Sequence, residues 1–467
     1  MKKRRIAAAI VAALGLLAVV PATRARAAGP AFTDAAGIHV VSSSSIDSRQ
    51  YNVQVSTPAL GRTVDVRILV PSDYDTSATA YPVLYLFHGT SGRASDWVNL
   101  GDAEAATAGL GLITVMPDAG FNGDGGGWFT NWYDTKTAEG PSQWETFHVN
   151  QLIPWVDANL RTIASRSGRA VAGLSQGGFG STTYAARHPD TFASVASFSG
   201  APDIDYNPVV AMGATGIIQA TAFFLDGVEQ DAMFGPRQTN EINWQGHDPA
   251  DMVTNLNGVD VWLWTANGFP GALDPPTPNP AASGIEAATH GSTLSFVQRA
   301  QMLNIPVHLN DYGNGTHTWP YWARDLKQYL PPLMATFASP PAAPATISYQ
   351  SIDQSWSQWG WSVSVERSVA QQFSSLTNAS AGGFTLSGAG TATVVTPASY
   401  APGAVEHVTV SSTTGSSTTV ATADGAGHLH LTVPLGPDVP SPFGSGAVMG
   451  VPGIPPWPST TVTISAA

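Results

Sequence analysis

The chain has 467 residues, of which 43% are hydrophobic and only 11% are charged, and its formal net charge is −13. This composition excludes a largely disordered chain, and the acidic balance disfavours nucleic acid and anionic membranes as partners, because both need a basic protein surface. The chain contains no cysteine, which excludes disulfides and thiolate metal sites, so the fold must be held together by its hydrophobic cores.

Residues 1–27 have the pattern of a secretory signal peptide. A basic start at residues 2–5 precedes an apolar run at residues 6–20, and the small-residue sequence Ala-Arg-Ala follows at residues 25–27. The apolar run is shorter than the about 20 residues that a spanning helix needs, so we expect it to be removed. The mature chain is therefore predicted to be extracellular or associated with the cell wall, without a transmembrane span.

Residues 28–338 are predicted to form one α/β domain. Continuous apolar runs bounded by glycine and proline predict buried strands at residues 62–75, 81–92, 111–120, 169–175, 192–200, 259–268 and 305–313. Helical patterns alternate with them at residues 144–160, 180–192 and 291–303. Alternating strands and helices predict a doubly wound, mostly parallel sheet, in which ligands bind at the carboxyl ends of the strands.

The composition changes after this domain. Residues 339–346, SPPAAPAT, predict a semi-rigid linker. Residues 347–467 contain short strands rich in threonine and valine, which predict a small all-β, sandwich-like domain. Three tryptophans cluster at residues 356–361. Packing in the sandwich core is the simpler explanation for them than a carbohydrate-binding face, although cell-wall polysaccharide is a candidate partner of this domain.

One serine is surrounded by glycines in the stretch AVAGLSQGGFG. Residues 173–177, Gly-Leu-Ser-Gln-Gly, match the G-x-S-x-G pattern, in which a sharp turn between a strand and a helix exposes the serine hydroxyl. Glycines flank the serine because the backbone passes closely there. An apolar strand precedes this stretch and a helical pattern follows it, so we interpret Ser175 as a nucleophile rather than as part of a plain glycine-rich turn.

A serine nucleophile needs a histidine base and an acid that orients the histidine, and in this fold class the chain order is serine, acid, histidine. His317 follows the last predicted strand, in the loop YGNGTHTWPYW, from which it can return over the serine. His290 and His247 are the alternatives. Two acids compete, Asp274 and Glu286. Spacing does not choose between them, and the chemistry alone slightly favours Asp274.

The charged oxygen that forms during acyl transfer needs backbone N–H donors. One donor is predicted to be the N–H of Gln176, directly after the serine, and the other to lie in the loop after an early strand. The sequence FHGTSG at residues 87–92 fits that loop, with Thr90 as the donor. Because no dinucleotide, phosphate-loop or EF-hand pattern occurs, we expect neither a cofactor nor a metal ion.

Together these segments resemble the mycolyltransferase (antigen 85) family, in the esterase branch of the α/β-hydrolases. The resemblance covers residues 53–333 and depends on five ordered matches besides the serine motif. They are GWFTNWYD followed by QWETFHVNQLIPWVDANL, then MFGP, NWQGHDP, VWLWTANG and NGTHTWPYW. The resemblance implies the α/β-hydrolase fold and acyl-transfer chemistry on an acyl ester or glycolipid substrate.

The resemblance also implies roles for particular residues. The family places its orienting glutamate on the segment that corresponds to GIEAATHG, which assigns the acid to Glu286. Ser175 and His317 correspond to the family's nucleophile and base. Trp319 corresponds to a pocket residue beside the histidine. These assignments give a Ser-His-Glu triad in this chain.

The chain departs from the family at the loop that supplies the second oxyanion donor. Where the family typically has Asp-Gly-Leu-Arg, this chain has His88, Gly89, Thr90 and Ser91. The family's acid and arginine help to hold a trehalose acceptor, and here His88 and Ser91 are expected in the substrate pocket instead. The family's cysteine near the late strand corresponds to Thr265. The backbone donor role of Thr90 does not depend on these changes.

Three functions remain open on the sequence. An acyl group can pass from an ester donor through an acyl-serine to a sugar alcohol such as trehalose, which makes a transferase. Water can take the place of the alcohol, which makes a carboxylic ester hydrolase, because the triad is the same for both and the pocket decides. A non-enzymatic adhesion or binding protein can also use a hydrolase scaffold.

Overall fold

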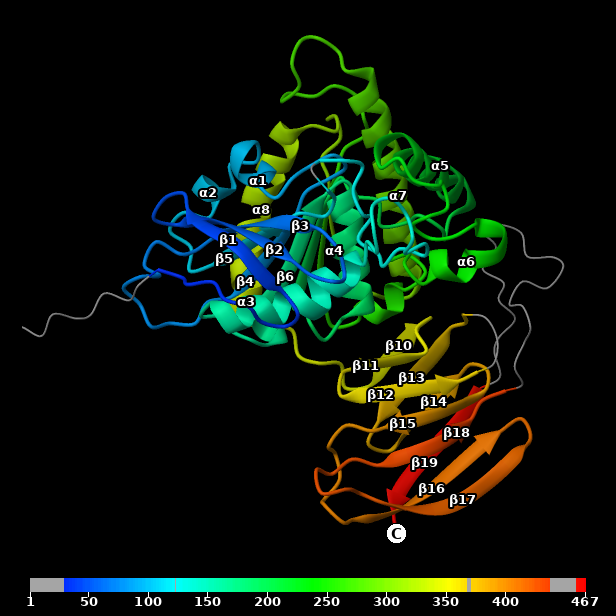
Figure 1. Ribbon diagram of the computed structural model, residues 1–467. Coiled ribbons are helices and arrows are strands. Elements are labelled where there is room, and N and C mark those ends of the chain that lie inside the picture. The colour runs from blue at the N-terminus through cyan, green and yellow to red at the C-terminus, as the bar shows by residue number, and fades with distance from the viewer. Residues whose placement is uncertain (1–28, 122, 368–370, 437–458) are drawn as a thin grey trace, which may run out of the picture.

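The computed structural model describes residues 29–121, 123–367, 371–436 and 459–467 (Figure 1). The predicted signal peptide, residues 1–27, lies outside the described residues. The chain forms an α/β part and an all-β part, and the all-β part lies below the other in Figure 1. Helix α8 ends at Ala338 and strand β10 begins at Ile347.

The α/β part is built on a nine-stranded sheet with the order β1-β2-β3-β5-β4-β6-β7-β8-β9. The strands are β1 His39–Ser45, β2 Gln50–Ser56, β3 Thr63–Leu69, β4 Val83–Phe87, β5 Ile113–Pro117, β6 Arg169–Leu174, β7 Ser194–Phe198, β8 Asp260–Thr265 and β9 His308–Asp311. The pairs from β1 to β5 along the sheet are antiparallel, and the pairs from β5 through β4 to β9 are parallel. The predicted fold class, a mostly parallel α/β sheet, is confirmed.

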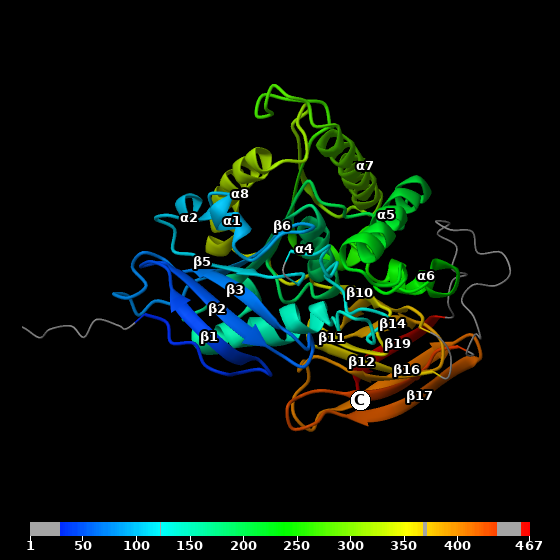
Figure 2. The same ribbon diagram turned by 45° about the horizontal axis from the view of Figure 1, so that its top comes forward.

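Helices cover both faces of this sheet, which explains the continuous apolar runs in its central strands. The α-helices are α1 Asp96–Asn99, α2 Ala103–Ala106, α3 Ile153–Asn159, α4 Gln176–Arg187, α5 Pro208–Ala220, α6 Arg237–Gln245, α7 Pro280–Met302 and α8 Trp319–Ala338. Short 3₁₀ or π segments are η1 Thr146–Leu152, η2 Arg166–Gly168, η3 Thr221–Leu225 and η4 Val253–Leu256. Helices α1, α2 and α8 pack in the core on one side of the sheet, where Figure 2 shows them together, and α3, α4 and α7 pack in the core on the other side.

Alternate residues of one strand enter two different cores, because successive side chains of a strand point to opposite faces. In β4, Val83, Tyr85 and Phe87 belong to the larger core under α3, α4 and α7. Leu84 and Leu86 belong to the core under α1, α2 and α8. The edge strand β9 differs from the expectation of full burial, since most of its residues are exposed.

Helix α7 begins well before the predicted helix at residues 291–303. Pro280 is at its first turn, and the side chain of Asn279 accepts a hydrogen bond from the N–H of Ala282. An asparagine cap followed by proline is a typical helix start. As a consequence Glu286 lies on the helix itself, and not on a segment ahead of it.

The all-β part contains two antiparallel sheets that share one core. The six-stranded sheet has the order β10-β13-β14-β19-β16-β17 and the four-stranded sheet the order β11-β12-β15-β18. The strands are β10 Ile347–Ser351, β11 Ser355–Gln358, β12 Trp361–Glu366, β13 Ser374–Ser380, β14 Gly383–Ser387, β15 Thr391–Val395, β16 Val405–Ser412, β17 Gly415–Thr422, β18 His430–Pro434 and β19 Ser459–Ala466.

The clustered tryptophans of the all-β part do not form an exposed platform. Trp356 and Trp361 are buried in the core between the sheets. The ring of Trp359 lies under the guanidinium of Arg166, and the backbone N–H of Trp359 donates to the carboxylate of Asp190 at 2.8 Å. Two of the three rings therefore pack in the sandwich, and the third contacts the α/β part.

A buried ion network joins the two parts of the molecule at the C-terminal end of α4. The guanidinium of Arg187 donates to Glu145 at 2.7 Å, to the carbonyl of Gly246 at 2.8 Å and to Asp353 of the all-β part at 3.0 Å. The hydroxyl of Tyr349 donates to the carbonyl of Arg187 at 2.7 Å. Helix α4, which begins directly after Ser175, is therefore held at its C-terminal end by residues of both parts.

Candidate active site

Ser175 lies in the sharp turn between β6 and α4. Its backbone has φ +53° and ψ −122°, a conformation that residues other than glycine rarely adopt. The flanking glycines are required by space, because a Cβ on Gly173 would lie 2.3 Å from the carbonyl oxygen of Gly177. A Cβ on Gly177 would lie 2.3 Å from the carbonyl oxygen of His88. The glycines that surround Ser175 thus permit a turn that lifts its hydroxyl out of the sheet.

His317 is hydrogen-bonded to Glu286, a residue 31 positions earlier in the chain. The Nδ1 of His317 lies 2.7 Å from Oε2 of Glu286. The other carboxylate oxygen, Oε1, accepts from the N–H of Ala266 at 2.8 Å and from the hydroxyl of Ser199 at 2.9 Å. Glu286 is fully buried. These three donors fix the orientation of the carboxylate, which in turn fixes the tautomer and the plane of the imidazole.

Asp274, the competing acid, makes different contacts. Its oxygens accept from the hydroxyl of Tyr321 and from the N–H of Gly271, both at 2.7 Å, and from the hydroxyl of Thr316. Thr316 directly precedes His317, so Asp274 stabilises the loop that carries His317 without bonding to the ring of His317. Among the described residues, Glu286 is the carboxylate that contacts the imidazole of His317.

The alternative histidines lie elsewhere. The Nε2 of His290 is 3.0 Å from the carboxylate of Asp311. His247 is buried beside Glu145, with its Nδ1 2.7 Å from the carbonyl of Asn243. Neither histidine is among the residues that line the cavity in front of Ser175.

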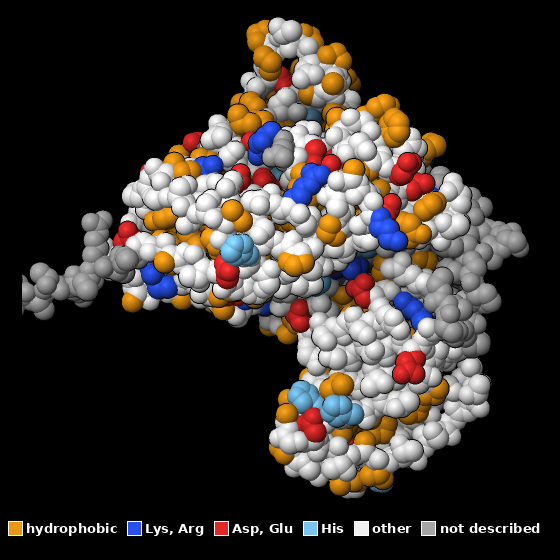
Figure 3. Space-filling view, in the orientation of Figure 1, with side chains coloured by type: hydrophobic (Ala, Val, Ile, Leu, Met, Phe, Trp, Pro, Cys, Tyr) orange, Lys and Arg blue, Asp and Glu red, His pale blue; other side chains and the backbone are white. Residues whose placement is uncertain are grey.

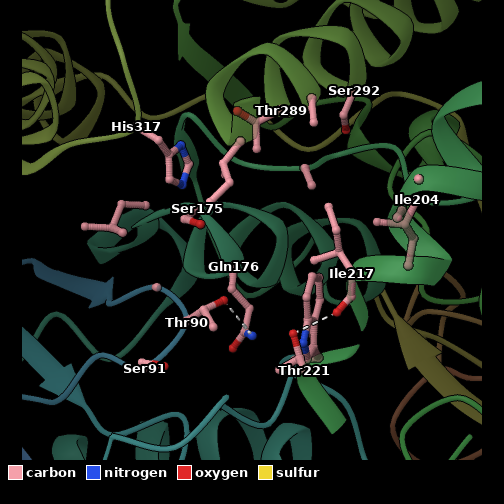
Figure 4. Close-up of a pocket in the computed structure, with 18 of the residues that line it drawn as sticks. Thr90, Ser91, Ser175, Gln176, Ile204, Ile217, Thr221, Thr289, Ser292 and His317 are labelled. Carbon is pink, nitrogen blue, oxygen red and sulfur yellow. Dashed lines mark hydrogen bonds between the residues drawn. The ribbon is translucent and has the colours of Figure 1, made fainter. Parts of the chain in front are cut away.

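A cavity of about 1100 Å³ opens in front of Ser175 at the carboxyl ends of the central strands. Ser175, Gln176, Thr90 and His317 line it, and Figure 4 shows the ring of His317 close to the side chain of Ser175. Within the described part of the chain, the Nε2 of His317 is buried without a hydrogen-bond partner. Ser91 and Trp319 also line the cavity, as the sequence predicts for pocket residues.

The sequence of the α/β part matches a family model over residues 57–333, and this family is described as "Putative esterase". The match covers more than half of the chain and includes every residue of the site described above. The chain belongs to this esterase family.

Curated relatives of this chain include enzymes of two kinds. Esterase MT1326 and Esterase Rv1288 of Mycobacterium tuberculosis are each 44% identical to it over 172 residues, 36% of this chain and 36% of each relative. The chain thus matches about a third of the length of these relatives. Diacylglycerol acyltransferase/mycolyltransferase Ag85B of Mycobacterium leprae is 30% identical over 301 residues, 62% of this chain and 84% of the relative.

Among solved structures, the crystal structure of Mycobacterium tuberculosis MPT51 (FbpC1) is similar to this chain. The sequence identity is 27%, the TM-score is 0.51, and the match covers 62% of this chain and 100% of that chain. The resemblance to mycolyltransferases seen in the sequence is thereby confirmed, together with the α/β-hydrolase fold.

Gln176 connects three loops around the serine. Its side-chain Nε2 donates to the hydroxyl of Thr90 at 3.2 Å and to the carbonyl of Gly125 at 3.0 Å. Its backbone N–H is in the first turn of α4, where N–H groups lack intrahelical partners. The Gln176 side chain therefore holds the loop of Thr90 at a fixed place relative to the start of the nucleophile helix.

His88 differs from its predicted place in the substrate pocket. Its ring is buried, its Nδ1 is 2.8 Å from the carbonyl of Gly89, and its Nε2 accepts from the N–H of Ala119 at 2.9 Å. Burial lowers the pKa of the His88 imidazole. Because backbone groups occupy both ring nitrogens, His88 shapes the loop of Thr90 and is not among the residues that line the cavity.

Two further residues shape the site without having been singled out in the sequence. Ser199 directly follows β7, the strand that pairs with the strand before Ser175. Because ligands gather at the ends of such strands, the sequence position of Ser199 could have indicated that it lies at the site. The position of Asp226 gave no such indication. Its Oδ1 accepts from the N–H of Gly126 at 3.2 Å, and burial together with the nearby Asp124 raises the pKa of the Asp226 carboxyl to about 8.

Proposed function

We propose that this chain is a secreted, serine-dependent acyl-transfer enzyme of the mycolyltransferase type. Ser175 is the nucleophile, His317 the base and Glu286 the acid that orients the base. The observation that carries the proposal is the arrangement of His317. One ring nitrogen is bonded to a buried glutamate, while the other is unpartnered in a cavity that Ser175 also lines.

The first step forms an acyl-serine. The Nε2 of His317 takes the proton from the Ser175 hydroxyl as its oxygen attacks the carbonyl carbon of an ester. The N–H groups of Thr90 and Gln176 donate to the oxyanion, and each such donor stabilises the transition state by about 3 kcal/mol. The His317 imidazolium, stabilised by Glu286, then returns the proton to the leaving alcohol.

The second step transfers the acyl group to an acceptor. The Nε2 of His317 takes a proton from a second alcohol, which attacks the acyl-serine, and Ser175 recovers its proton when the ester product leaves. A sugar alcohol such as trehalose is the proposed acceptor, by likeness to the mycolyltransferase relatives. Water is the alternative, because His88 and Ser91 stand where the family typically has the aspartate and the arginine that help to hold the sugar.

Two substitutions test the roles of the serine and the histidine. In Ser175→Ala and in His317→Ala, hydrolysis of a p-nitrophenyl acyl ester is expected to fall by about 10³-fold or more, with an unchanged melting temperature. His290→Ala is the matched control, because His290 is also paired with an acid but lies outside the cavity. Turnover close to wild type in either variant would exclude the mechanism.

Product analysis tests the acceptor. Purified enzyme is incubated with trehalose monomycolate and, separately, with short-chain esters, and the lipids are separated. Trehalose dimycolate in the wild type and its absence in Ser175→Ala is the expected result. Free fatty acid as the sole product would assign the chain to the ester hydrolases instead.

A further inference from the structure

The segment Pro208–Leu225, made of α5 and η3, is unusually apolar for a surface helix. It contains no charged residue, and its mean hydropathy is 1.6. In the part of the chain that the structure describes, it is the one helix that is apolar and long enough to cross a membrane, yet only 22% of it is buried. A segment of this composition normally faces a core or a lipid phase.

The apolar side chains of this segment point outward. Val209 is 76% exposed, Met212 65% and Phe224 75%, and Ile217 and Phe223 are also exposed. On α5, Val209, Met212 and Ile217 are three and five residues apart and lie on the outer side of the helix, and Phe223 and Phe224 follow in η3. An ordinary surface helix turns such a face inward. We call these five residues the apolar face.

The few polar side chains of the segment are turned inward. The hydroxyl of Thr215 accepts from Arg237 at 2.7 Å, the side-chain amide of Gln219 donates to Asp231 at 3.0 Å, and the hydroxyl of Thr221 donates to the carbonyl of Ile217 at 2.8 Å. The bonds of Thr215 and Gln219 reach residues outside the segment and fix the rotation of the helix, whereas the bond of Thr221 lies within the segment. The apolar face cannot turn inward unless the bonds of Thr215 and Gln219 break, so its exposure is a built feature of the fold.

The apolar face borders the mouth of the catalytic cavity. Val209, Ile217 and Phe224 line this cavity together with Ser175. On other elements, Leu100 is 54% exposed and Ile285 44% exposed, and both line the same cavity. The apolar face and the cavity are therefore continuous, and an apolar chain that lies on this face can reach the cavity along Val209, Ile217 and Phe224.

The charges around the apolar face indicate which kind of lipid surface it can bind. Residues 202–236 contain no lysine or arginine, and the acidic residues Glu229 and Asp231 follow closely after the apolar segment. Figure 3 shows hydrophobic side chains over α5 with acidic side chains close by. An anionic lipid surface attracts basic residues and repels acidic ones, so this region is matched to an uncharged or zwitterionic surface.

We propose that the apolar face docks on an uncharged or zwitterionic lipid surface and that the acyl donor enters the cavity from there. This depends on the proposed function for the identity of the substrate, but not for the docking itself. A protein partner or a second copy seated on this face would close the mouth that the substrate must enter. Insertion across a bilayer would require the bonds of Thr215 and Gln219 to break in an apolar medium.

Flotation with phosphatidylcholine vesicles tests the docking. We expect the wild type to float with the vesicles and Met212→Ser/Phe223→Ser to bind about tenfold more weakly or worse, because two exposed apolar side chains are lost. Neither residue lines the cavity, so turnover of a soluble p-nitrophenyl ester without vesicles should stay at the wild-type level. Met302→Ser/Val420→Ser is the matched control, since these residues are 62% and 59% exposed but lie on other elements, α7 and β17.

The outcomes separate this proposal from the catalytic one. Ser175→Ala should float like the wild type although it has lost turnover. Unchanged flotation of Met212→Ser/Phe223→Ser would overturn the docking, as would tighter binding to phosphatidylglycerol than to phosphatidylcholine. A protein that resists alkaline extraction from vesicles would show a spanning segment instead. A dimer that dissociates in Met212→Ser/Phe223→Ser would show a self-association surface. Either result would also overturn the proposal.

Discussion

The two ends of helix α4 contain opposite kinds of polar site. At its N-terminal end, Ser175 faces a cavity, and the nearby Nε2 of His317 has no partner among the described residues. At its C-terminal end, Arg187 is buried and bonded to Glu145, Gly246 and Asp353. At the N-terminal end a ring nitrogen is available to accept a proton, whereas at the C-terminal end each nitrogen of the Arg187 guanidinium has a hydrogen-bond partner.

The difference separates polar groups that are arranged for chemistry from those arranged for stability. A buried polar group without a partner lowers the stability of the fold. The Nε2 of His317 is such a group, and a hydrogen bond to a substrate hydroxyl or to Ser175 can offset this loss. At the other end, burial alone would raise the pKa of the Glu145 carboxyl, but Arg187 and His188 outweigh it and hold that pKa well below its usual range. Glu145 therefore stays ionised and Arg187 stays compensated.

Removing the charge of Glu286 should have the largest effect at the cavity end. Glu286→Gln is expected to lower kcat by about 10³-fold, because the amide no longer holds the imidazole in the correct tautomer. Asp274→Asn should lower it by about tenfold at most, since Asp274 acts on the histidine loop through Thr316 and Tyr321. Steady-state kinetics with a p-nitrophenyl ester measure both, and a greater loss in Asp274→Asn would reject Glu286 as the acid.

At the other end of α4, a substitution should change stability more than catalysis. Arg187→Met leaves the carboxylate of Glu145 buried without its cation, which should lower the free energy of unfolding by about 3–5 kcal/mol. Urea denaturation measures this change. The exposed pair Arg62–Glu139, with Arg62 40% exposed, is the control, and Arg62→Met should cost about 1 kcal/mol or less. Equal losses of unfolding free energy in the two variants would show that the buried ion pair stabilises the fold no more than the exposed pair does.

The smallest expected effect concerns the position of an oxyanion donor. Gln176→Leu removes the bonds to the Thr90 hydroxyl and to the Gly125 carbonyl but keeps both backbone N–H groups, so kcat should fall about tenfold with little change in KM. Thr90→Val breaks only the bond between the two side chains. The double variant should be no worse than Gln176→Leu alone, because the bond that Thr90→Val removes is then already lost. Additive losses would show that the two side chains act separately.

Much of the fold could be predicted from local sequence patterns. The buried strands were found because their apolar runs are continuous and end in glycine or proline, and Ser175 was found because its turn needs flanking glycines. Strands β1 and β2 and helix α5 were not singled out. The pattern for helices assumes that apolar side chains point inward, whereas α5 turns Thr215 and Gln219 inward and Met212 outward.

The choice of acid and the ion network required the three-dimensional structure. Asp274 and Glu286 both lie between the serine and the histidine in sequence, and the structure distinguishes them because Glu286 contacts the ring of His317, whereas Asp274 contacts Gly271, Thr316 and Tyr321. Glu145 and Asp353 are 42 and 166 positions from Arg187, so no local pattern connects them. Family resemblance indicated Glu286, but nothing in the sequence indicated that the all-β part supplies a partner to the nucleophile helix.

The attachment of the all-β part has a consequence for engineering this enzyme. A truncation in the linker would remove the carboxylate of Asp353, which the guanidinium of Arg187 contacts. It would also remove the hydroxyl of Tyr349, which donates to the backbone carbonyl of Arg187. A chimera with a different appended module would therefore need to supply both groups at the same place. The all-β part therefore helps to hold the C-terminal end of helix α4, and it cannot be exchanged for another module unless these contacts are replaced.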